Sequence, residues 1–146
     1  MADARKTWES KQFWVIAHNN YLDIAILEWC KLFTDRAGKH HWRKSVTDQD
    51  AFRAKLLSEI RCDEEAFLEY ALSLKIYRDK FVAHLDEDNE IAMPKMTIAR
   101  LSTQTLFRWL REHEDDCNAY HDAPRRAEDF YALNFAHARK ALRGEA

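Results

Sequence analysis

Residues 63–81, DEEAFLEYALSLKIYRDKF, carry the pattern that decides the fold. Apolar residues recur at the three- and four-residue steps of one helix face. They are Phe67, Ala71, Leu74, Tyr77 and Phe81. The acids that open the stretch, Asp63 first, suit the unpaired N–H groups and the positive dipole end of a helix. The sequence predicts a helix that begins at Asp63 and ends near Leu85, before an acidic loop at residues 86–90.

The composition extends this helical interpretation to the whole chain. The 146 residues are 47% hydrophobic and 33% charged, which is typical of a globular domain. The only glycines and prolines are Gly38, Gly144, Pro94 and Pro124. A sandwich or barrel needs many more turn residues. We therefore predict an all-α chain, an antiparallel bundle of four or five helices that forms a single domain over residues 1–146.

Helices are also predicted on both sides of residues 63–81. The first should run from about Thr7 to Phe33, with an apolar stripe that other helices cover. Thr47 and Asp50 resemble a capping box that opens a short helix through Ile60. The remaining helices should begin after Pro94, reaching about Cys117, and near Asp122 and Pro124.

Charge and cysteine content restrict the compartment and the partners. The formal net charge of −2 gives no overall positive field of the kind that marks many nucleic-acid binders. The three cysteines are odd in number and have no close pairing, which suits a reducing compartment. No signal-type or membrane-spanning apolar stretch is present. We expect a cytoplasmic protein without a membrane partner.

Arginine and histidine are the residues that remain after a search for catalytic motifs. The chain has no glycine-rich phosphate loop, paired-cysteine zinc pattern or nucleophile elbow. An arginine followed by a histidine, with four to six residues between them, occurs three times, and about two such matches are expected by chance. The pairs are Arg36 with His41, Arg78 with His84, and Arg108 with His113.

The residue after each arginine separates these pairs. Arg78 is followed by the polar Asp79, whereas Ala37 and Trp109 follow the other two arginines. The run YRDKFVAHLD at residues 77–86 resembles the motif of the abortive-infection branch of the HEPN family, in which a polar residue follows the arginine. WCKLF at residues 29–33 and HWRK at residues 41–44 also resemble that branch.

This resemblance implies a HEPN-like helical fold and a homodimer that joins two copies of the motif across a two-fold axis. It implies a metal-independent endoribonuclease that acts as a toxin or phage-defence effector, with RNA as substrate and an antitoxin or regulatory protein as a further partner. Some HEPN toxins carry a modified tyrosine two positions after the histidine. Asp86 stands there in this chain, which argues against that mode of control.

Arg78, His84 and Asp79 are the candidate catalytic residues. Histidine suits proton transfer because its unperturbed pKa of ~6.5 lies near operating pH. The arginine fork matches phosphate oxygens and stays charged. Asp79 is expected to orient Arg78 or His84, and we expect no metal and no cofactor. The alternative is a non-catalytic HEPN-like module that dimerises or binds a partner or nucleotide, in which Arg78 pairs with an acid and His84 caps the helix.

Two weaker patterns complete the candidates. Arg36, Lys39, His41, Trp42, Arg43 and Lys44 form a basic segment. It could hold RNA phosphates with Trp42 stacked on a base, or be a solvated loop with Trp42 anchored in the bundle, which we favour for the tryptophan. His113, Cys117 and His121 recur at four-residue steps, which would suit a metal site. A packed helix face is the simpler interpretation of these three residues.

Overall fold

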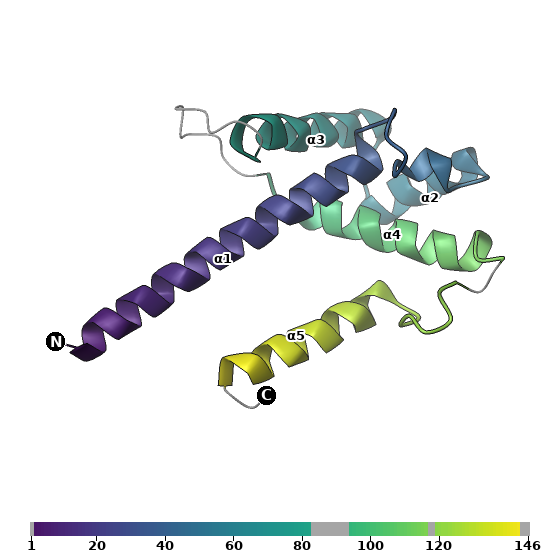
Figure 1. Ribbon diagram of the computed structural model, residues 1–146. Helices are drawn as coiled ribbons and strands as arrows, with labels where there is room; N and C mark the ends of the chain where they lie inside the picture. Colours follow the sequence, from purple (N-terminus) through teal and green to yellow (C-terminus); the bar gives the residue numbers. More distant parts are fainter. Residues whose placement is uncertain (1, 83–93, 117–118, 144–146) are drawn as a thin grey trace. The chain divides into compact units, whose positions relative to one another are not determined.

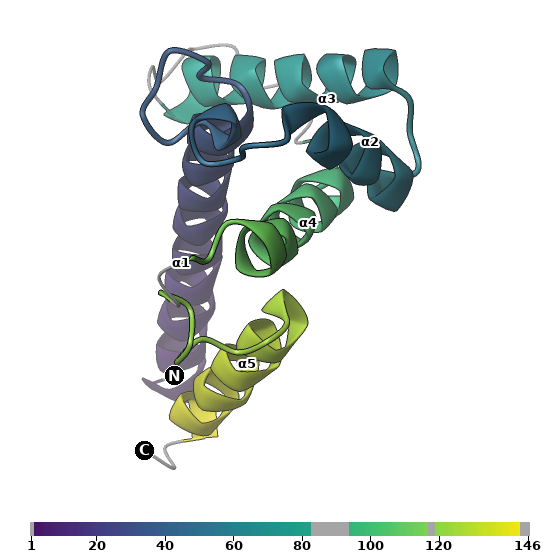
Figure 2. The same cartoon turned by 90° about the vertical axis from the view of Figure 1, so that its right-hand side faces the viewer.

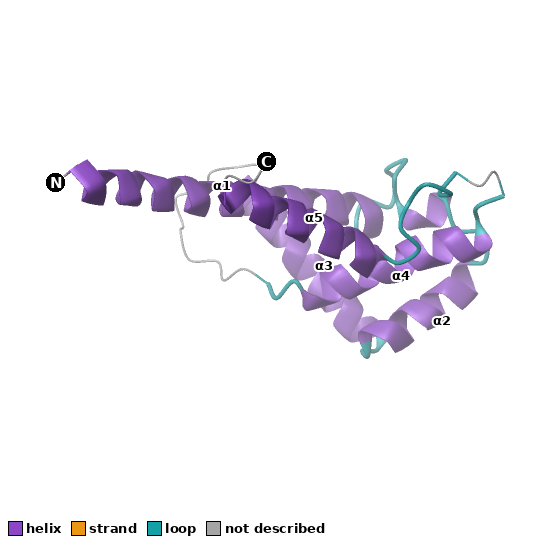
Figure 3. Ribbon diagram, turned by 90° about the horizontal axis from the view of Figure 1, so that it is seen from below, coloured by secondary structure: helices purple, strands orange, loops and turns teal. Residues whose placement is uncertain are grey.

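The computed structural model describes residues 2–82, 94–116 and 119–143. Those ranges contain helices and loops and no strand, so the all-α prediction is confirmed there (Figures 1 and 3). The α-helices are α1 (Ala2–Phe33), α2 (Gln49–Ile60), α3 (Glu64–Tyr77), α4 (Thr97–His113) and α5 (Ala127–Arg143). Two shorter turns accompany them, a 3-10 turn η1 (Trp42–Lys44) and a π-helical turn η2 (Arg78–Val82). No helix in the described ranges is long and apolar enough to cross a membrane.

The chain divides into two compact units. The first unit comprises Met1–His41 and Leu68–Pro94, and the second comprises Trp42–Phe67 and Lys95–Ala146. The prediction of a single domain stays a prediction.

The helix boundaries follow the predicted signals in part. The first helix begins at Ala2 and not near Thr7, and α3 passes into η2 after Tyr77, while Leu85, where we expected that helix to end, lies outside the described residues. Asp63 caps α3 as predicted, because its Oδ1 accepts a hydrogen bond from the backbone N–H of Ala66 at 2.9 Å. The prediction that Thr47 caps α2 is wrong. Asp48 caps it and accepts from the N–H of Ala51 at 3.0 Å, while Thr47 bonds Glu114.

The ends of the last two helices differ slightly from the predictions. The fourth helix ends at His113, and Cys117, to which we expected it to extend, lies outside the described residues. The fifth begins at Ala127, three residues after Pro124.

The first unit is held together at the C-terminal end of α1, across which α3 lies (Figures 1 and 2). Trp29 is 3% exposed, stacks on Phe33 with ring centroids 5.0 Å apart, and meets Tyr70 of α3 edge-on at 5.6 Å. Ile26 and Leu74 are fully buried. In the C-terminal half of α1, the predicted apolar stripe therefore packs against α3 and forms the core of the first unit.

The N-terminal half of α1 is an exposed apolar surface. A shallow hollow of about 290 Å³ follows one face of the helix. We call this surface the α1 face, and it consists of Phe13, Ile16, Ala17, Asn20, Tyr21 and Ile24. Its large apolar members are between 53% and 72% exposed. Trp14 and Val15, which belong to the predicted stripe, are 49% and 59% exposed, so the described residues do not cover the N-terminal half of that stripe as expected.

The second unit is built on the antiparallel pairing of α2 with α4. Thr47, just before α2, bonds Glu114, the residue that follows the last residue of α4, and Phe52 meets Trp109 edge-on at 5.5 Å. Phe52 is fully buried and also packs on Trp42 at 4.9 Å. These contacts place the start of α2 beside the end of α4. They also give the unit an aromatic core.

The segment before α5 is tied to α4. Nη1 of Arg111 donates to the carbonyl oxygens of Ala123 and Pro124, at 2.8 and 2.6 Å. Charged donors make strong hydrogen bonds to carbonyl groups, so one side chain anchors the approach to α5.

Candidate functional site

Arg78 is the first residue of η2 and lies between two carboxylates. Its Nη1 donates to both oxygens of Asp35, at 2.8 and 2.9 Å, and its Nε donates to Asp79 Oδ1 at 2.9 Å. Only 16% of the Arg78 side chain is exposed, against 37% for Asp35 and 51% for Asp79. Among the described residues, these carboxylates engage Nε and Nη1 and do not bond Nη2. The guanidinium is therefore fixed in orientation, and one edge is not used by either acid.

The loop after α1 positions Asp35. The carbonyl oxygen of Cys30 accepts hydrogen bonds from the backbone N–H groups of Thr34 and Asp35, at 2.8 and 3.0 Å, and from the Thr34 hydroxyl at 3.0 Å. The N–H of Gly38 then donates to the Asp35 carbonyl oxygen at 2.7 Å. These bonds end the helix and hold the Asp35 backbone in a tight turn, with its carboxylate toward Arg78.

The electrostatics of this cluster keep Arg78 charged and the nearby thiol neutral. Burial alone would lower the pKa of Arg78, but the hydrogen bonds that the guanidinium donates to Asp35 and Asp79 outweigh it and raise the pKa above its ordinary value. Burial raises the pKa of the Cys30 thiol, so Cys30 is not an activated nucleophile. The guanidinium is a permanent charge of the kind that binds a phosphate.

Tyr77 fixes the end of α3 next to Arg78. Its hydroxyl donates to Asp23 Oδ1 at 3.3 Å, which links α3 to α1. Burial and the Asp23 carboxylate both raise the pKa of Tyr77, so the phenol keeps its proton at neutral pH. Tyr77 therefore serves as a hydrogen-bonded support for the segment that carries Arg78.

The structure brings two of the three predicted catalytic residues into contact. Asp79 accepts a hydrogen bond from Arg78, and Arg78 also pairs with a second acid, Asp35. The catalytic role of these residues stays a prediction. His84 lies outside the described residues. Sequence reasoning missed Asp35, because nothing in the loop pattern at residues 34–38 links it to a position 43 residues away.

The predicted RNA-binding segment is divided between surface and interior. His41 and Trp42 are 2% and 6% exposed, and Trp42 packs in the core of the second unit. This is the position that we favoured for Trp42 from the sequence, anchored in the helical bundle and not stacked on an RNA base. The remaining members are three exposed cations, Arg36, Lys39 and Lys44, and the half-buried Arg43, whose guanidinium carbon lies 5.2 Å from the Trp42 ring centroid. RNA binding by the exposed cations stays a prediction.

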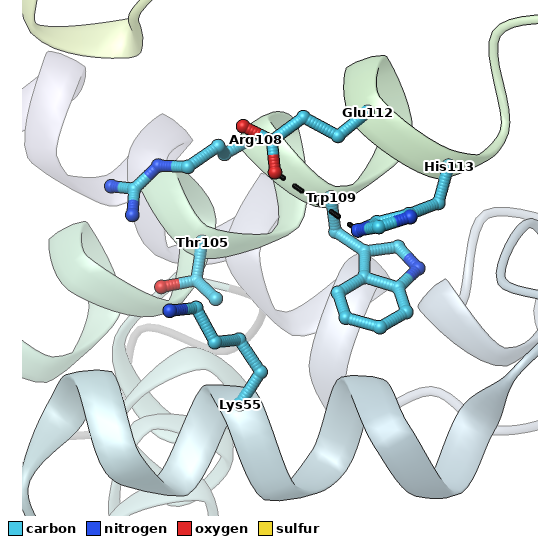
Figure 4. Close-up of a pocket in the computed structure, with 6 residues that line it drawn as sticks. All are labelled: Lys55, Thr105, Arg108, Trp109, Glu112 and His113. Carbon is cyan, nitrogen blue, oxygen red and sulfur yellow. Dashed lines mark ion pairs between the residues drawn. The ribbon is translucent and has the colours of Figure 1, made fainter.

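A small cavity lies between α2 and α4 in the second unit (Figure 4). Its lining residues come from one face of α4 and from one lysine of α2: Thr105, Arg108, Trp109, Glu112, His113 and Lys55. Arg108 and His113 are the third arginine–histidine pair of the sequence. Figure 4 shows their side chains extending toward opposite ends of the cavity. The sequence pattern could not reveal the cavity, because Lys55 belongs to another helix.

Metal-binding clusters and known relatives give no further assignment. No group of three or more His, Cys, Asp or Glu side chains in the described ranges is arranged to hold a metal ion, and Cys117 lies outside those ranges. No protein-family model matches this chain, and neither does any curated protein or solved structure. A function can therefore be inferred only from the residues of this chain and their contacts.

Proposed function

We propose that this protein is a metal-independent endoribonuclease with a HEPN-like antiparallel bundle fold, which acts as a homodimer and serves as a toxin or phage-defence effector. The observation that supports the proposal is the fixed guanidinium of Arg78. It lies directly after α3, between Asp35 and Asp79, in the segment whose sequence resembles the HEPN motif. A preoriented charge of this kind stabilises developing charge without reorganisation during the reaction.

The proposed reaction is attack of a ribose 2′-oxygen on the adjacent phosphorus. The 2′-hydroxyl loses its proton to a base, the new O–P bond forms, and the bond to the 5′-oxygen breaks as that oxygen receives a proton. The products are a 2′,3′-cyclic phosphate and a 5′-hydroxyl. His84 transfers protons, Arg78 binds the negatively charged phosphorane, and Asp79 orients Arg78. Two copies of the site supply one histidine for each proton transfer.

The α1 face supports the second copy. Its large apolar side chains offer on the order of 600 Å² of exposed surface, which approaches the ~800 Å² per partner of a standard interface. Between residues 12 and 27 the only charged side chain is Asp23, which Tyr77 already bonds. A two-fold pairing of this face therefore brings no like charges together.

The test is cleavage of a single-stranded RNA in EDTA by wild type, Arg78→Ala and His84→Ala, with circular dichroism to show that each is folded. We expect wild type alone to cleave and to leave a cyclic phosphate. Lys75→Ala, which removes an exposed cation of the same α3–η2 segment, is the matched control and should cleave like wild type. Equal cleavage by all four proteins would refute the assignment of Arg78 and His84.

A second candidate function is favoured by the Asp35 contact. Both Asp35 oxygens already accept hydrogen bonds from Arg78 Nη1. A phosphate that binds Nη1 must therefore share this donor with Asp35 or displace the Asp35 carboxylate. A non-catalytic HEPN-like module that dimerises or binds a partner needs Arg78 only for this structural contact. In that case wild type does not cleave RNA, and Arg78→Ala lowers the free energy of unfolding without any other loss.

A further inference from the structure

The cavity between α2 and α4 has the size and the wall chemistry of a small-group binding site. Its volume is about 110 Å³, which is below the ~300 Å³ at which pockets for whole drug-sized ligands begin. A phosphoryl group fits this space, with the rest of the ligand outside. Lys55 from α2 and Arg108 from α4 supply its cations, and Trp109 and His113 supply its aromatic side (Figure 4).

The two cations are brought to one place by a shared carboxylate. Glu59 Oε1 accepts from Lys55 Nζ at 2.9 Å and from Arg108 Nη1 at 3.3 Å. An ammonium has three donors and a guanidinium has five, so each cation keeps most of its donors. Among the described residues, Glu59 is the only carboxylate that pairs with either cation. Lys55 is 51% exposed and Arg108 39%, so an anion from solvent can reach both.

The aromatic side of the cavity is rigid. Trp109 meets the buried Phe52 edge-on, and its indole N–H donates to Glu114 Oε1 at 3.3 Å. The imidazole of His113 lies over the indole with ring centroids 4.2 Å apart and an interplanar angle of 43°. His113 remains 50% exposed, so it can contact a further planar ring. Stacking on such a side chain suits a nucleobase of any sequence.

We propose that this cavity binds a nucleotide, with its phosphate between Lys55 and Arg108 and its base against His113. The guanidinium and ammonium donors match phosphate oxygens. Glu112 lies beside His113, 4.0 Å from its Nε2, and repels a phosphate from that end. The charge pattern therefore fixes the orientation of the ligand. This site is independent of any reaction at Arg78.

The experiment is calorimetric titration of the full-length protein with inorganic phosphate and with adenosine monophosphate at one salt concentration. We expect the nucleotide to bind more tightly than phosphate, because only the nucleotide has a base. Lys55→Gln and Arg108→Gln should each weaken both ligands roughly tenfold. Lys140→Gln removes an exposed cation of α5 that does not line the cavity, and it should bind like wild type. Circular dichroism checks that each variant is folded.

Two further variants distinguish a binding site from an ordinary ion-pair cluster. Glu59→Gln releases both cations from their shared carboxylate, so we expect both ligands to bind several-fold more tightly. His113→Ala should remove the advantage of the nucleotide over phosphate and leave phosphate binding unchanged. The proposal is overturned if neither ligand binds wild type, if both bind it equally, or if Glu59→Gln weakens binding.

Discussion

Arg78 and Asp35, 43 residues apart in the chain, are joined by two hydrogen bonds, both donated by Nη1 of the guanidinium. Nε donates to Asp79, so these two acids leave only Nη2 unused. The pair connects the end of α3 to the loop that ends α1. Because Arg78 is 16% exposed, the pair is shielded from water more than an ordinary surface ion pair. The same contact therefore has a structural effect and fixes the direction of a charge suited to phosphate.

The Arg78–Asp35 pair should contribute measurably to stability. We expect Asp35→Ala to lower the free energy of unfolding by about 1–3 kcal/mol, because it leaves a largely buried guanidinium with one carboxylate fewer. Urea denaturation measures the change. Glu28→Gln is the matched control, since it removes an exposed ion pair with Lys31 and should cost no more than ~0.5 kcal/mol. Equal effects of the two variants would contradict this interpretation.

The contact between Thr47 and Glu114 should make stability depend on acid pH. Hydrogen bonds from the Thr47 N–H and hydroxyl, at 2.8 and 2.7 Å, lower the pKa of Glu114 from its ordinary 4.5. A lowered folded-state pKa stabilises the protein above about pH 4.5, and this stabilisation is lost as the pH falls through the folded pKa.

We therefore expect Glu114→Gln to melt at a lower temperature than wild type at neutral pH, and the difference to shrink at about pH 3. Thermal melts monitored by circular dichroism measure this. Glu69→Gln, an exposed acid of α3, serves as control and should follow wild type at both pH values. A difference between Glu114→Gln and wild type that does not change with pH would show that the carboxylate charge has no part in this contact.

The α1 face should control self-association. Ile16→Glu together with Ile24→Glu places two charges on this face, and we expect the protein to become monomeric because a buried unpaired carboxylate is costly. Light scattering coupled to size-exclusion chromatography measures the mass. Asn19→Glu adds a charge outside the α1 face and should leave the mass unchanged. A monomeric wild type would refute the dimer, and a dimer that survives both Ile substitutions would place its interface elsewhere.

Trp42 and Lys44 should separate core packing from RNA binding. Trp42→Ala removes a core ring that packs on Phe52, so we expect the free energy of unfolding to fall by ~3–5 kcal/mol. Lys44→Gln should leave stability within ~0.5 kcal/mol and reduce the salt dependence of RNA binding by about one phosphate contact. Denaturation and filter binding at several salt concentrations measure the two effects. An unchanged salt dependence in Lys44→Gln would remove Lys44 from the RNA-binding residues.

Local signals predicted the helices well, because the determinants of a helix lie within a few residues. Asp63 precedes α3 and caps it, as its position before Glu64 and Glu65 indicated. Thr47 misled the prediction because its hydroxyl has a partner distant in sequence, Glu114, which only the folded chain brings near. The neighbouring Asp48 then caps α2 instead.

The candidate site was harder to predict, because its partners come from other elements. The motif identified Arg78 and Asp79, which are adjacent in sequence, but not Asp35 from the loop after α1. Trp42 was easier to place, because a large apolar ring favours burial even within a basic segment. The anchored position was preferred from sequence, and Trp42 packs on Phe52 in the core.

The π-helical turn η2 changes the helical phase of the chain at Arg78. In such a turn each N–H bonds the carbonyl five residues back instead of four, so successive side chains advance by a smaller angle than in α3. An α-helical wheel drawn through Tyr77 therefore misplaces Asp79 and Lys80. Loss of one residue within 80–82 would restore the α-helical phase and turn the chain that follows relative to Arg78 and Asp79. This turn should accordingly tolerate substitutions at Lys80 far better than any change in its length.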